Sequence, residues 1–160
     1  MNEPHDPPEE IERKYLLSSL PPRAAASPFV DIEQGYLPGT TLVERLRLER
    51  DGTGKRRWRT VKAGRGLRRI ELEEPCDAEL FSALWPFTAG RRLTKRRYFV
   101  REANNGPVWE VDNFTDRELV LAEVELAGLD SPVTLPGWLE PYVVREVTGS
   151  SEYVNSELAR

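Results

Sequence analysis

Residues 119–127 read Leu-Val-Leu-Ala-Glu-Val-Glu-Leu-Ala, and the second half of this stretch alternates between apolar and acidic side chains. Side chains two residues apart on a β-strand point to the same face of the sheet. Ala122, Val124 and Leu126 therefore share one face, whereas Glu123 and Glu125 share the other. The stretch predicts a strand with one apolar face and one acidic face.

The same period of two recurs along most of the chain. It predicts strands over residues 10–15, 43–48, 57–63, 69–73, 93–101 and 108–114, with further strands at 29–37 and 142–148. Turns rich in glycine, proline and asparagine separate these stretches. Residues 77–85 instead have helical spacing, and Asp77 can cap the start of this helix while Pro86 ends it. The sequence thus predicts about four strands, a helix and about four more strands.

The polar faces of these strands carry charges of the same sign two residues apart. The acidic pairs are Glu10/Glu12, Glu71/Glu73, Glu110/Asp112 and Glu123/Glu125; the basic pairs are Arg45/Arg47 and Lys95/Arg97, with Lys14 and Lys62 as further candidates. Like charges on one face repel each other, so these pairs favour a shared interior that holds ions of both signs. A barrel of about eight strands is wide enough to hold a small ligand. A solvated sheet face with ordinary surface ion pairs is the alternative interpretation.

The residue types on this face indicate which ions the interior would bind. Gathered carboxylates are unfavourable unless cations offset them, and oxygen ligands without His or Cys favour Mg²⁺ or Mn²⁺. Separate pairs of arginine and lysine favour an anion rich in oxygens, such as a polyphosphate. Lysine occurs only at positions 14, 55, 62 and 95. Three of these four positions fall on the charged faces, where a compact ammonium suits a point-charge contact to phosphate.

Length and composition limit the class of protein. The 160 residues are enough for one domain, which we place at residues 9–160 after a flexible N-terminal tail at 1–8. The 23 basic residues are outnumbered by 27 acidic ones, which argues against a nucleic-acid partner. A single cysteine excludes a disulfide framework. No apolar run approaches the ~18 residues of a membrane span. We therefore expect a cytoplasmic monomer or homodimer without a membrane partner.

The first predicted strand, Glu10-Ile11-Glu12-Arg13-Lys14, is an ExExK motif, and it opens an ordered series. The series continues with Gln-Gly-Tyr-Leu at 34–37, Arg-Leu-Arg at 45–47, Thr-Val-Lys at 60–62, and the segments 69–73, 95–98, 109–114, 122–126, 146–148 and 153–159. In this order the chain resembles the CYTH family, the triphosphate tunnel metalloenzymes, over residues 9–159. It is most similar to short bacterial inorganic triphosphatases.

The resemblance implies a mainly β fold of the α+β class, namely an eight-stranded antiparallel β-barrel that forms a charged tunnel, with a few helices packed outside. It implies that a triphosphate and a divalent metal, Mg²⁺ or Mn²⁺, bind in this tunnel. The implied metal ligands are Glu10, Glu12, Glu123, Glu125 and Asp112. The implied phosphate ligands are Lys14, Arg45, Arg47, Lys62, Lys95 and Arg97. Glu71, Glu73 and Glu110 would be further acidic residues of the tunnel.

The activity that this resemblance implies is hydrolysis of a small anion, inorganic tripolyphosphate, to pyrophosphate and phosphate. Lys14 and Tyr36 are the candidate catalytic residues, with Tyr36 as general base if the Lys14 ammonium lowers the pKa of its hydroxyl. A class IV adenylate cyclase, a thiamine or nucleoside triphosphatase, and a non-catalytic module that binds polyphosphate or nucleotide are the alternatives. An organic substrate would need further contacts, for which Tyr15, Trp58 and Tyr98 are available.

Overall fold

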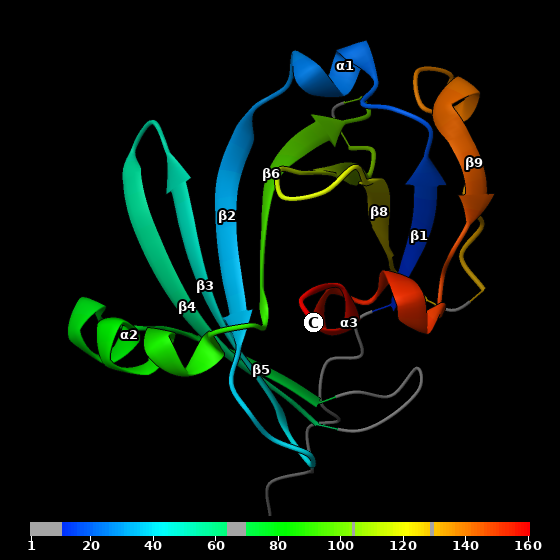
Figure 1. Ribbon diagram of the computed structural model, residues 1–160. Coiled ribbons are helices and arrows are strands. Elements are labelled where there is room, and N and C mark those ends of the chain that lie inside the picture. The colour runs from blue at the N-terminus through cyan, green and yellow to red at the C-terminus, as the bar shows by residue number, and fades with distance from the viewer. Residues whose placement is uncertain (1–10, 64–69, 104, 129) are drawn as a thin grey trace, which may run out of the picture.

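The computed structural model describes residues 11–63, 70–103, 105–128 and 130–160 (Figure 1). Its strands are β1 (Ile11–Leu17), β2 (Phe29–Tyr36), β3 (Val43–Asp51), β4 (Gly54–Ala63), β5 (Ile70–Pro75), β6 (Arg92–Arg101), β7 (Val108–Phe114), β8 (Val120–Leu126) and β9 (Val143–Glu146). The helical elements are α1 (Pro22–Ala25), α2 (Ala78–Leu84), η1 (Trp85–Thr88), η2 (Glu140–Tyr142), η3 (Ser151–Tyr153) and α3 (Asn155–Leu158). In this part of the chain, no helix is long and apolar enough to span a bilayer. The predicted mainly β fold is confirmed.

The nine strands form one antiparallel sheet in the order β5-β4-β3-β2-β6-β7-β8-β1-β9. The sheet curves around α3, as Figure 1 shows. The expected closed eight-stranded barrel is not confirmed, because no pairing between described residues joins β5 to β9 or β1. Part of the reason is the ninth strand. β9 pairs with β1 over residues 15–17, so this stretch of β1 has no free edge for β5.

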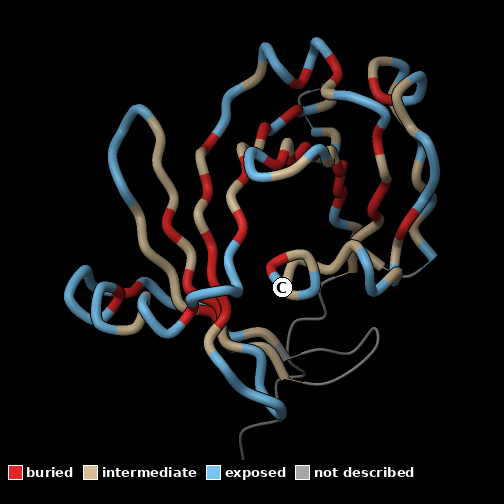
Figure 2. The backbone as a smooth tube through the Cα atoms, viewed as in Figure 1, coloured by how far each residue is buried: buried red, intermediate tan, exposed pale blue. Residues whose placement is uncertain are grey.

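Strand register decides which side chains face the concave side of the curved sheet. Lys14 of β1 lies opposite Glu123 of β8, and Glu123 in turn lies opposite Glu110 of β7. Because alternate residues share a face, these charged positions all point to the same side. Figure 2 shows that the buried stretches lie in the middle of the strands rather than at the turns. The alternation in the sequence therefore sorts charged and apolar residues between the two faces.

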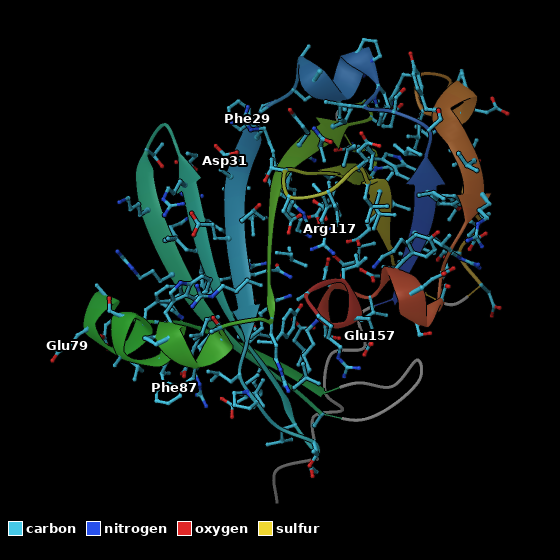
Figure 3. All side chains as sticks on the ribbon, viewed as in Figure 1. Phe29, Asp31, Glu79, Phe87, Arg117 and Glu157 are labelled. Carbon is cyan, nitrogen blue, oxygen red and sulfur yellow. The ribbon has the colours of Figure 1, made fainter. Side chains whose placement is uncertain are left out.

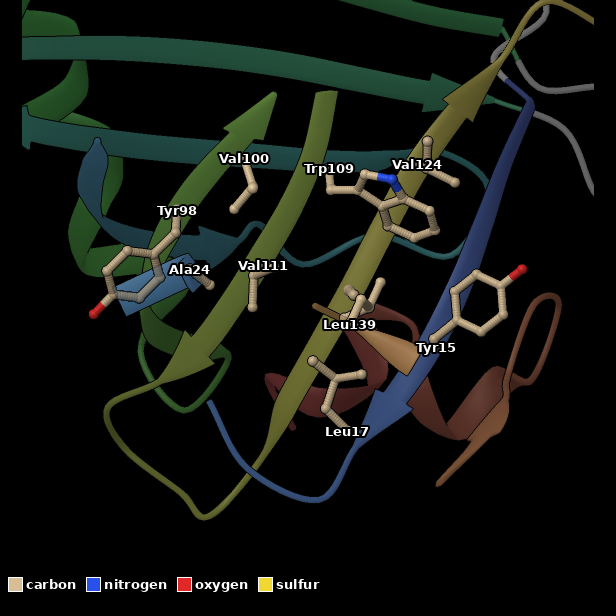
Figure 4. Packing of buried hydrophobic residues seen from close by; sticks show 10 residues of the cluster. Tyr15, Leu17, Ala24, Tyr98, Val100, Trp109, Val111, Val124 and Leu139 are labelled. Carbon is tan, nitrogen blue, oxygen red and sulfur yellow. The ribbon is translucent and has the colours of Figure 1, made fainter. Parts of the chain in front are cut away.

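Apolar side chains of the convex face pack beneath the helices and loops outside the sheet. One cluster consists of Tyr15, Leu17, Ala24, Tyr98, Val100, Trp109, Val111, Ala122, Val124 and Leu139 (Figure 4). A second cluster joins Leu46 and Leu48 of β3 to Phe81 of α2. The Asp77 carboxylate accepts a hydrogen bond from the backbone N–H of Leu80, at 2.8 Å, and so caps α2. The predicted helix at 77–85 is thereby confirmed as α2. The 3₁₀ helix η1 follows it directly.

A third apolar cluster lies on the concave face and closes one end of it. Its buried members are Tyr36, Leu93, Phe114, Leu121, Val147 and Ala159, with Leu16, Leu119, Tyr153 and Leu158 packed against them. The last residues of the chain thus contribute Ala159 and Leu158 to the inside of the curved sheet. The charged part of the concave face begins where this cluster ends.

Gly35 of β2 is the position where the outer covering comes closest to the sheet. A Cβ at this position would lie 2.6 Å from both Cβ and Oγ1 of Thr88. Thr88 is fully buried, and its Oγ1 accepts a hydrogen bond from Arg92 Nε at 2.8 Å and donates one to the Trp85 carbonyl at 2.7 Å. Thr88 therefore has little freedom to move away from a methyl group.

Replacing Gly35 by Ala is expected to lower the free energy of unfolding by about 1–3 kcal/mol, the usual cost of overpacking. Chemical denaturation with urea measures this loss. Gly52→Ala is the matched control, because a Cβ at Gly52 would meet nothing within 4 Å. Equal stability of Gly35→Ala and Gly52→Ala would contradict the tight contact with Thr88.

Candidate active site

The structure places the charged residues singled out from the sequence on one face of the sheet. By register and mutual ion pairs, the concave face carries Glu12, Lys14, Tyr36, Arg45, Arg47, Lys62, Glu71, Glu73, Lys95, Arg97, Glu110, Asp112, Glu123 and Glu125. Glu10 lies outside the described residues. The side chains of Lys95 and Asp112 are each only 1% exposed. A solvated face with surface ion pairs is therefore the wrong interpretation for the centre of this group.

The most deeply buried ion pairs centre on Asp112 of β7. Arg97 donates from Nε to Asp112 Oδ1 at 2.6 Å and from Nη2 to Oδ2 at 2.7 Å. Lys95 donates from Nζ to the same Oδ2. Burial alone would raise the pKa of Asp112, but these two cations hold it well below its usual range. Burial lowers the pKa of Lys95 to about 8, although Asp112 opposes this shift.

Asp112 was expected among the metal ligands, and in the structure its carboxylate is paired with two buried cations. Both of its carboxylate oxygens already accept hydrogen bonds from Arg97 and Lys95. A metal ion would have to displace at least one of these buried cations. The contacts support a role for Asp112 in orienting Arg97 and Lys95, and its role as a metal ligand stays a prediction.

Lys14 of β1 links these pairs to the acidic end of the face. Its Nζ lies 2.9 Å from Glu123 Oε1 and 3.7 Å from Glu12 Oε1. Arg97 Nη2 contacts the other oxygen of Glu123 at 3.4 Å. Burial would raise the pKa of Glu123, but Lys14 and Arg97 lower it below its ordinary value. Burial would also lower the pKa of Lys14, but Glu123 and Glu12 raise it. Lys14 and Glu123 are therefore both ionised at neutral pH.

A second network of charges lies on β3, β4 and β5. The Glu73 carboxylate accepts hydrogen bonds from Arg45 Nη2 at 3.0 Å and from Arg47 Nη2 at 3.0 and 3.2 Å. The buried Thr60 hydroxyl donates to Glu73 at 2.8 Å and accepts from Arg45 at 3.0 Å. Next to them, Lys62 Nζ lies 2.8 Å from Glu71 Oε2. Glu73 and Thr60 thus fix two arginines side by side.

The two networks face each other across the concave side of the sheet. The positive charge of Lys62, on β4, acts on Glu12 of β1 strongly enough to affect the pKa of its carboxyl. Arg97 of β6 likewise acts on Arg47 of β3. Burial, then repulsion from Arg45, lowers the pKa of Arg47. Strands that are far apart in the sheet order therefore present their charges to one shared space.

Within the second network, two donor groups have no hydrogen-bond acceptor among the residues that the structure describes. They are the Nε atoms of Arg45 and Arg47, which are both buried. Glu49 lies 3.1 Å from Arg47 Nε as an ion pair, without the geometry of a hydrogen bond. A buried donor left unpaired is costly, so these two N–H groups favour binding of an anion with several oxygens.

The opposite end of the site is a cavity of about 390 Å³ lined by carboxylates. Its acidic lining residues are Glu12, Glu110, Glu123 and Glu125. Burial, and then the charge of Glu123, raises the pKa of Glu12, and burial raises the pKa of Glu110. Such crowding of negative charge fits the donor chemistry of a hard divalent cation. Among the described residues, no group of three Asp, Glu, His or Cys side chains lies close enough together to hold a metal ion.

Tyr36 lies at the boundary between the charged face and the concave apolar cluster. Its hydroxyl accepts a hydrogen bond from Gln34 Nε2 at 3.0 Å. Burial raises the pKa of Tyr36 to about 12, even though Arg45 acts to lower it. The lowered pKa expected from Lys14 is therefore not found. Among the nearby cations, Arg45 lowers the pKa of Tyr36 most. Because the general-base role depended on that lowered pKa, we do not assign it to Tyr36.

Some residues of the site were missed by the sequence analysis. Thr60 was recognised only as part of a motif, although its position two residues before Lys62 places it on the charged face. Asn155 contacts Lys95 from the last helix, with 3.4 Å between Lys95 Nζ and Asn155 Oδ1. No alternation marks this contact, because Asn155 lies outside the strands and 60 residues from Lys95.

The fold and the site define a class of protein, because a curved antiparallel sheet with facing cations and carboxylates on its concave side is the triphosphate tunnel, or CYTH, architecture. The inorganic triphosphatase of Nitrosomonas europaea is 37% identical to this chain over 153 residues, which cover 94% of this chain and 96% of that protein. The chain belongs to this family of inorganic triphosphatases.

Two further comparisons agree with this assignment. The inorganic triphosphatase of Acetivibrio thermocellus is 29% identical over 157 residues, covering 95% of this chain and 94% of that protein. The crystal structure of the inorganic triphosphatase NE1496 has a TM-score of 0.65 and 32% identity, covering 94% of this chain and 93% of that one. No family model matches the chain.

Proposed function

We propose that the chain hydrolyses a phosphoanhydride bond of a triphosphate in a reaction that depends on Mg²⁺ or Mn²⁺, with inorganic tripolyphosphate as the substrate. The observation that carries this proposal is the pair of facing charge networks on the concave side. Relatives named inorganic triphosphatase, with near-complete coverage of both chains, support it further. Transfer of a phosphoryl group needs charge neutralisation and positioning more than covalent catalysis, which suits a site built from ionic side chains.

Six cations are available to hold the phosphate oxygens, and they come from four strands. They are Lys14, Arg45, Arg47, Lys62, Lys95 and Arg97. The carboxylates that pair with them, chiefly Glu73 and Asp112, fix the directions of their donors before substrate arrives. Preorganised donors of this kind stabilise the charge that develops in a transition state. In this assignment Lys14, which is paired with Glu123 and Glu12 of the acidic cavity, carries a catalytic role.

The acidic cavity supplies the ligands for the metal in this proposal. Glu12, Glu123 and Glu125 would hold the ion, with Glu110 beside them in the same cavity. A bound divalent cation neutralises phosphate oxygens and lowers the pKa of a coordinated water.

The placement of aromatic residues favours an inorganic substrate over an organic triphosphate. Tyr15 and Tyr98, which an adenine or thiamine group could have used, belong to the cluster on the convex face. They cannot reach a ligand on the concave side. Trp58 does lie on the concave face opposite Arg47. Its indole N–H already donates a hydrogen bond to Glu49 at 3.2 Å, so this donor is not free for an organic group.

A phosphate-release assay across substrates and metals tests this function. Tripolyphosphate, ATP and thiamine triphosphate are each incubated with the purified chain in Mg²⁺, Mn²⁺, Ca²⁺ or a chelator. We expect the highest kcat/KM with tripolyphosphate in Mg²⁺ or Mn²⁺, and no release in the chelator. Preference for ATP or thiamine triphosphate would reject the inorganic substrate. Binding of tripolyphosphate without turnover under every condition would instead identify a non-catalytic binding module.

A further inference from the structure

The last residues of the chain cross the concave face rather than extending away from it. In Figure 1, η3 and α3 lie inside the curve of the sheet. Ala159 is 3% exposed and packs in the concave apolar cluster with Tyr36 and Leu121. Arg117, in the loop between β7 and β8, donates from its guanidinium to the carbonyl of Leu158. Figure 3 labels Arg117 on this loop and Glu157 on α3. The C-terminal segment, residues 151–159, is therefore fixed against the site.

The C-terminal segment and the chain just before it hold Lys14 at several points. The backbone N–H of Val147 donates to the Lys14 carbonyl at 2.8 Å. The backbone N–H of Lys14 donates to Thr148 Oγ1 at 3.0 Å. At the other end of this side chain, Lys14 Nζ donates to the Tyr153 carbonyl at 3.4 Å. The ammonium thus lies between Glu123, on the sheet, and the carbonyl of Tyr153, on the C-terminal segment.

Lys95 is placed in the same manner. Its ammonium donates to Asp112 on the sheet side and to Asn155 Oδ1, at 3.4 Å, on the side of the C-terminal segment. The Lys95 side chain is 1% exposed, so its ammonium depends on these two contacts for its direction. The amide oxygen of Asn155 is a neutral acceptor. It fixes the direction of the ammonium without cancelling the positive charge that a phosphate would need.

We propose that Asn155 is a positioning residue of the substrate site, and that it acts by aiming the Lys95 ammonium toward bound triphosphate. This inference rests on the proposed function and extends the site to the C-terminal segment. Without Asn155, the strongest remaining partner of Lys95 is the Asp112 carboxylate, which draws the ammonium back toward the sheet. Lys95 would then contribute less to binding the substrate, while the fold of the chain and the charge of Lys95 stay the same.

The variant Asn155→Ala tests this role in the full-length protein. We expect KM for tripolyphosphate to rise about tenfold, the size of effect that one hydrogen bond to a charged group produces, with kcat changed less than KM. Calorimetric titration of tripolyphosphate in the absence of divalent metal should show a similar loss of affinity. Glu157→Ala is the matched control, because Glu157 lies on the same helix and is paired with Arg160 at the surface. Unchanged KM and affinity in Asn155→Ala would overturn the proposal.

A double-mutant cycle separates positioning from a merely structural contribution. If Asn155 acts through Lys95, then adding Asn155→Ala to Lys95→Met should cause no further loss of affinity. Additive losses would show that Asn155 acts elsewhere and would reject the proposal. Asn155→Asp keeps the size of the side chain if Asn155→Ala fails to fold. Its carboxylate would pair with Lys95 and repel the substrate, so affinity should fall at least as much, whereas affinity equal to that of the wild type would reject the positioning role.

These outcomes can be told apart from failure of the proposed function. If the wild-type chain releases no phosphate from any triphosphate, the proposed hydrolysis is rejected. The titration of tripolyphosphate then still decides the role of Asn155. A loss of affinity in Asn155→Ala supports that role, and equal affinity in both proteins rejects it.

Discussion

Replacing Glu123 by Gln is expected to reduce kcat/KM for tripolyphosphate by about 10²–10³-fold, the range found when one preorganised electrostatic group is removed from an active site. Steady-state phosphate release with Mg²⁺ and with Mn²⁺ measures the loss. The response to metal concentration should weaken as well, because Glu123 lines the acidic cavity. Because Glu123 is buried and paired, circular dichroism first checks that the variant is folded under the assay conditions.

The expected effect is large because Glu123 contacts both halves of the site. Its carboxylate is paired with Lys14 at 2.9 Å and with Arg97 at 3.4 Å, and it also faces the cavity that would hold the metal. An amide at this position carries one donor group and no charge. That donor would point at Lys14 or Arg97, both of which are donors themselves. One substitution would therefore disturb a phosphate-binding cation and the metal ligands together.

Glu118→Gln provides the matched control for this experiment. Glu118 is exposed in the loop between β7 and β8, so the substitution removes one negative charge without touching the concave face. We expect its kcat/KM to stay within about twofold of the wild-type value, as for substitutions at exposed positions. If Glu123→Gln also retained kcat/KM within that margin and the same dependence on metal, Glu123 would not belong to the active site.

The sequence was sufficient to predict which face each charged residue occupies. Because strand side chains alternate with a period of two, the spacing of Arg45 and Arg47, or of Glu123 and Glu125, determined that each pair shares a face. The apolar residues between them, such as Leu46 and Val124, predicted the packed opposite face. These predictions needed only local order along the chain, and the register of the strands agrees with them.

Partners across the sheet could not be predicted in the same way. Nothing in the spacing indicates that Glu73 joins Arg45 and Arg47, because this pairing depends on the register of three strands. Closure of the barrel was not confirmed, for a related reason. A strand over 142–148 was expected and β9 lies within it, but its position at the edge of β1 follows from pairing between residues about 130 positions apart.

The environment of single side chains was the least predictable feature. The hydroxyl of Tyr36 was expected to be influenced by Lys14, yet the structure surrounds it with Gln34 and Arg45 and buries it. Burial in a folded chain depends on every element that packs nearby, and the C-terminal segment is one of these elements. Asn155 was missed for the same reason, since its contact with Lys95 arises only when α3 folds against the sheet.

The second large effect concerns stability and is expected for Asp112→Asn. Asp112 is the shared partner of Lys95 and Arg97, and its side chain is 1% exposed. Removing one member of a buried ion pair typically costs about 3–5 kcal/mol, because the remaining charges are left buried without compensation. We therefore expect the free energy of unfolding at pH 7 to fall by about this amount. Urea denaturation followed by circular dichroism measures it.

Asp31→Asn is a closely matched control, because the neighbouring arginine makes a similar pair on the opposite face. Arg96 donates from Nε to Asp31 Oδ1 at 2.7 Å and from Nη2 to Oδ2 at 3.0 Å. The Asp31 side chain is 43% exposed, and Figure 3 labels it on β2. The geometry of the two pairs is alike but the solvation differs. Because exposed ion pairs contribute about 0–1 kcal/mol, Asp31→Asn should have a small effect.

The dependence on pH gives the Asp112 prediction its sharpest test. The pKa of Asp112 is lower in the folded chain than the ~3.9 of an unfolded aspartate. Its ionised carboxylate therefore stabilises the fold fully above about pH 4, and this contribution is lost as pH falls from there toward the folded pKa. Between pH 5 and pH 3, the difference in unfolding free energy between wild type and Asp112→Asn should therefore narrow. A difference that stayed constant down to pH 3 would show that the charge of Asp112 does not hold this part of the site together.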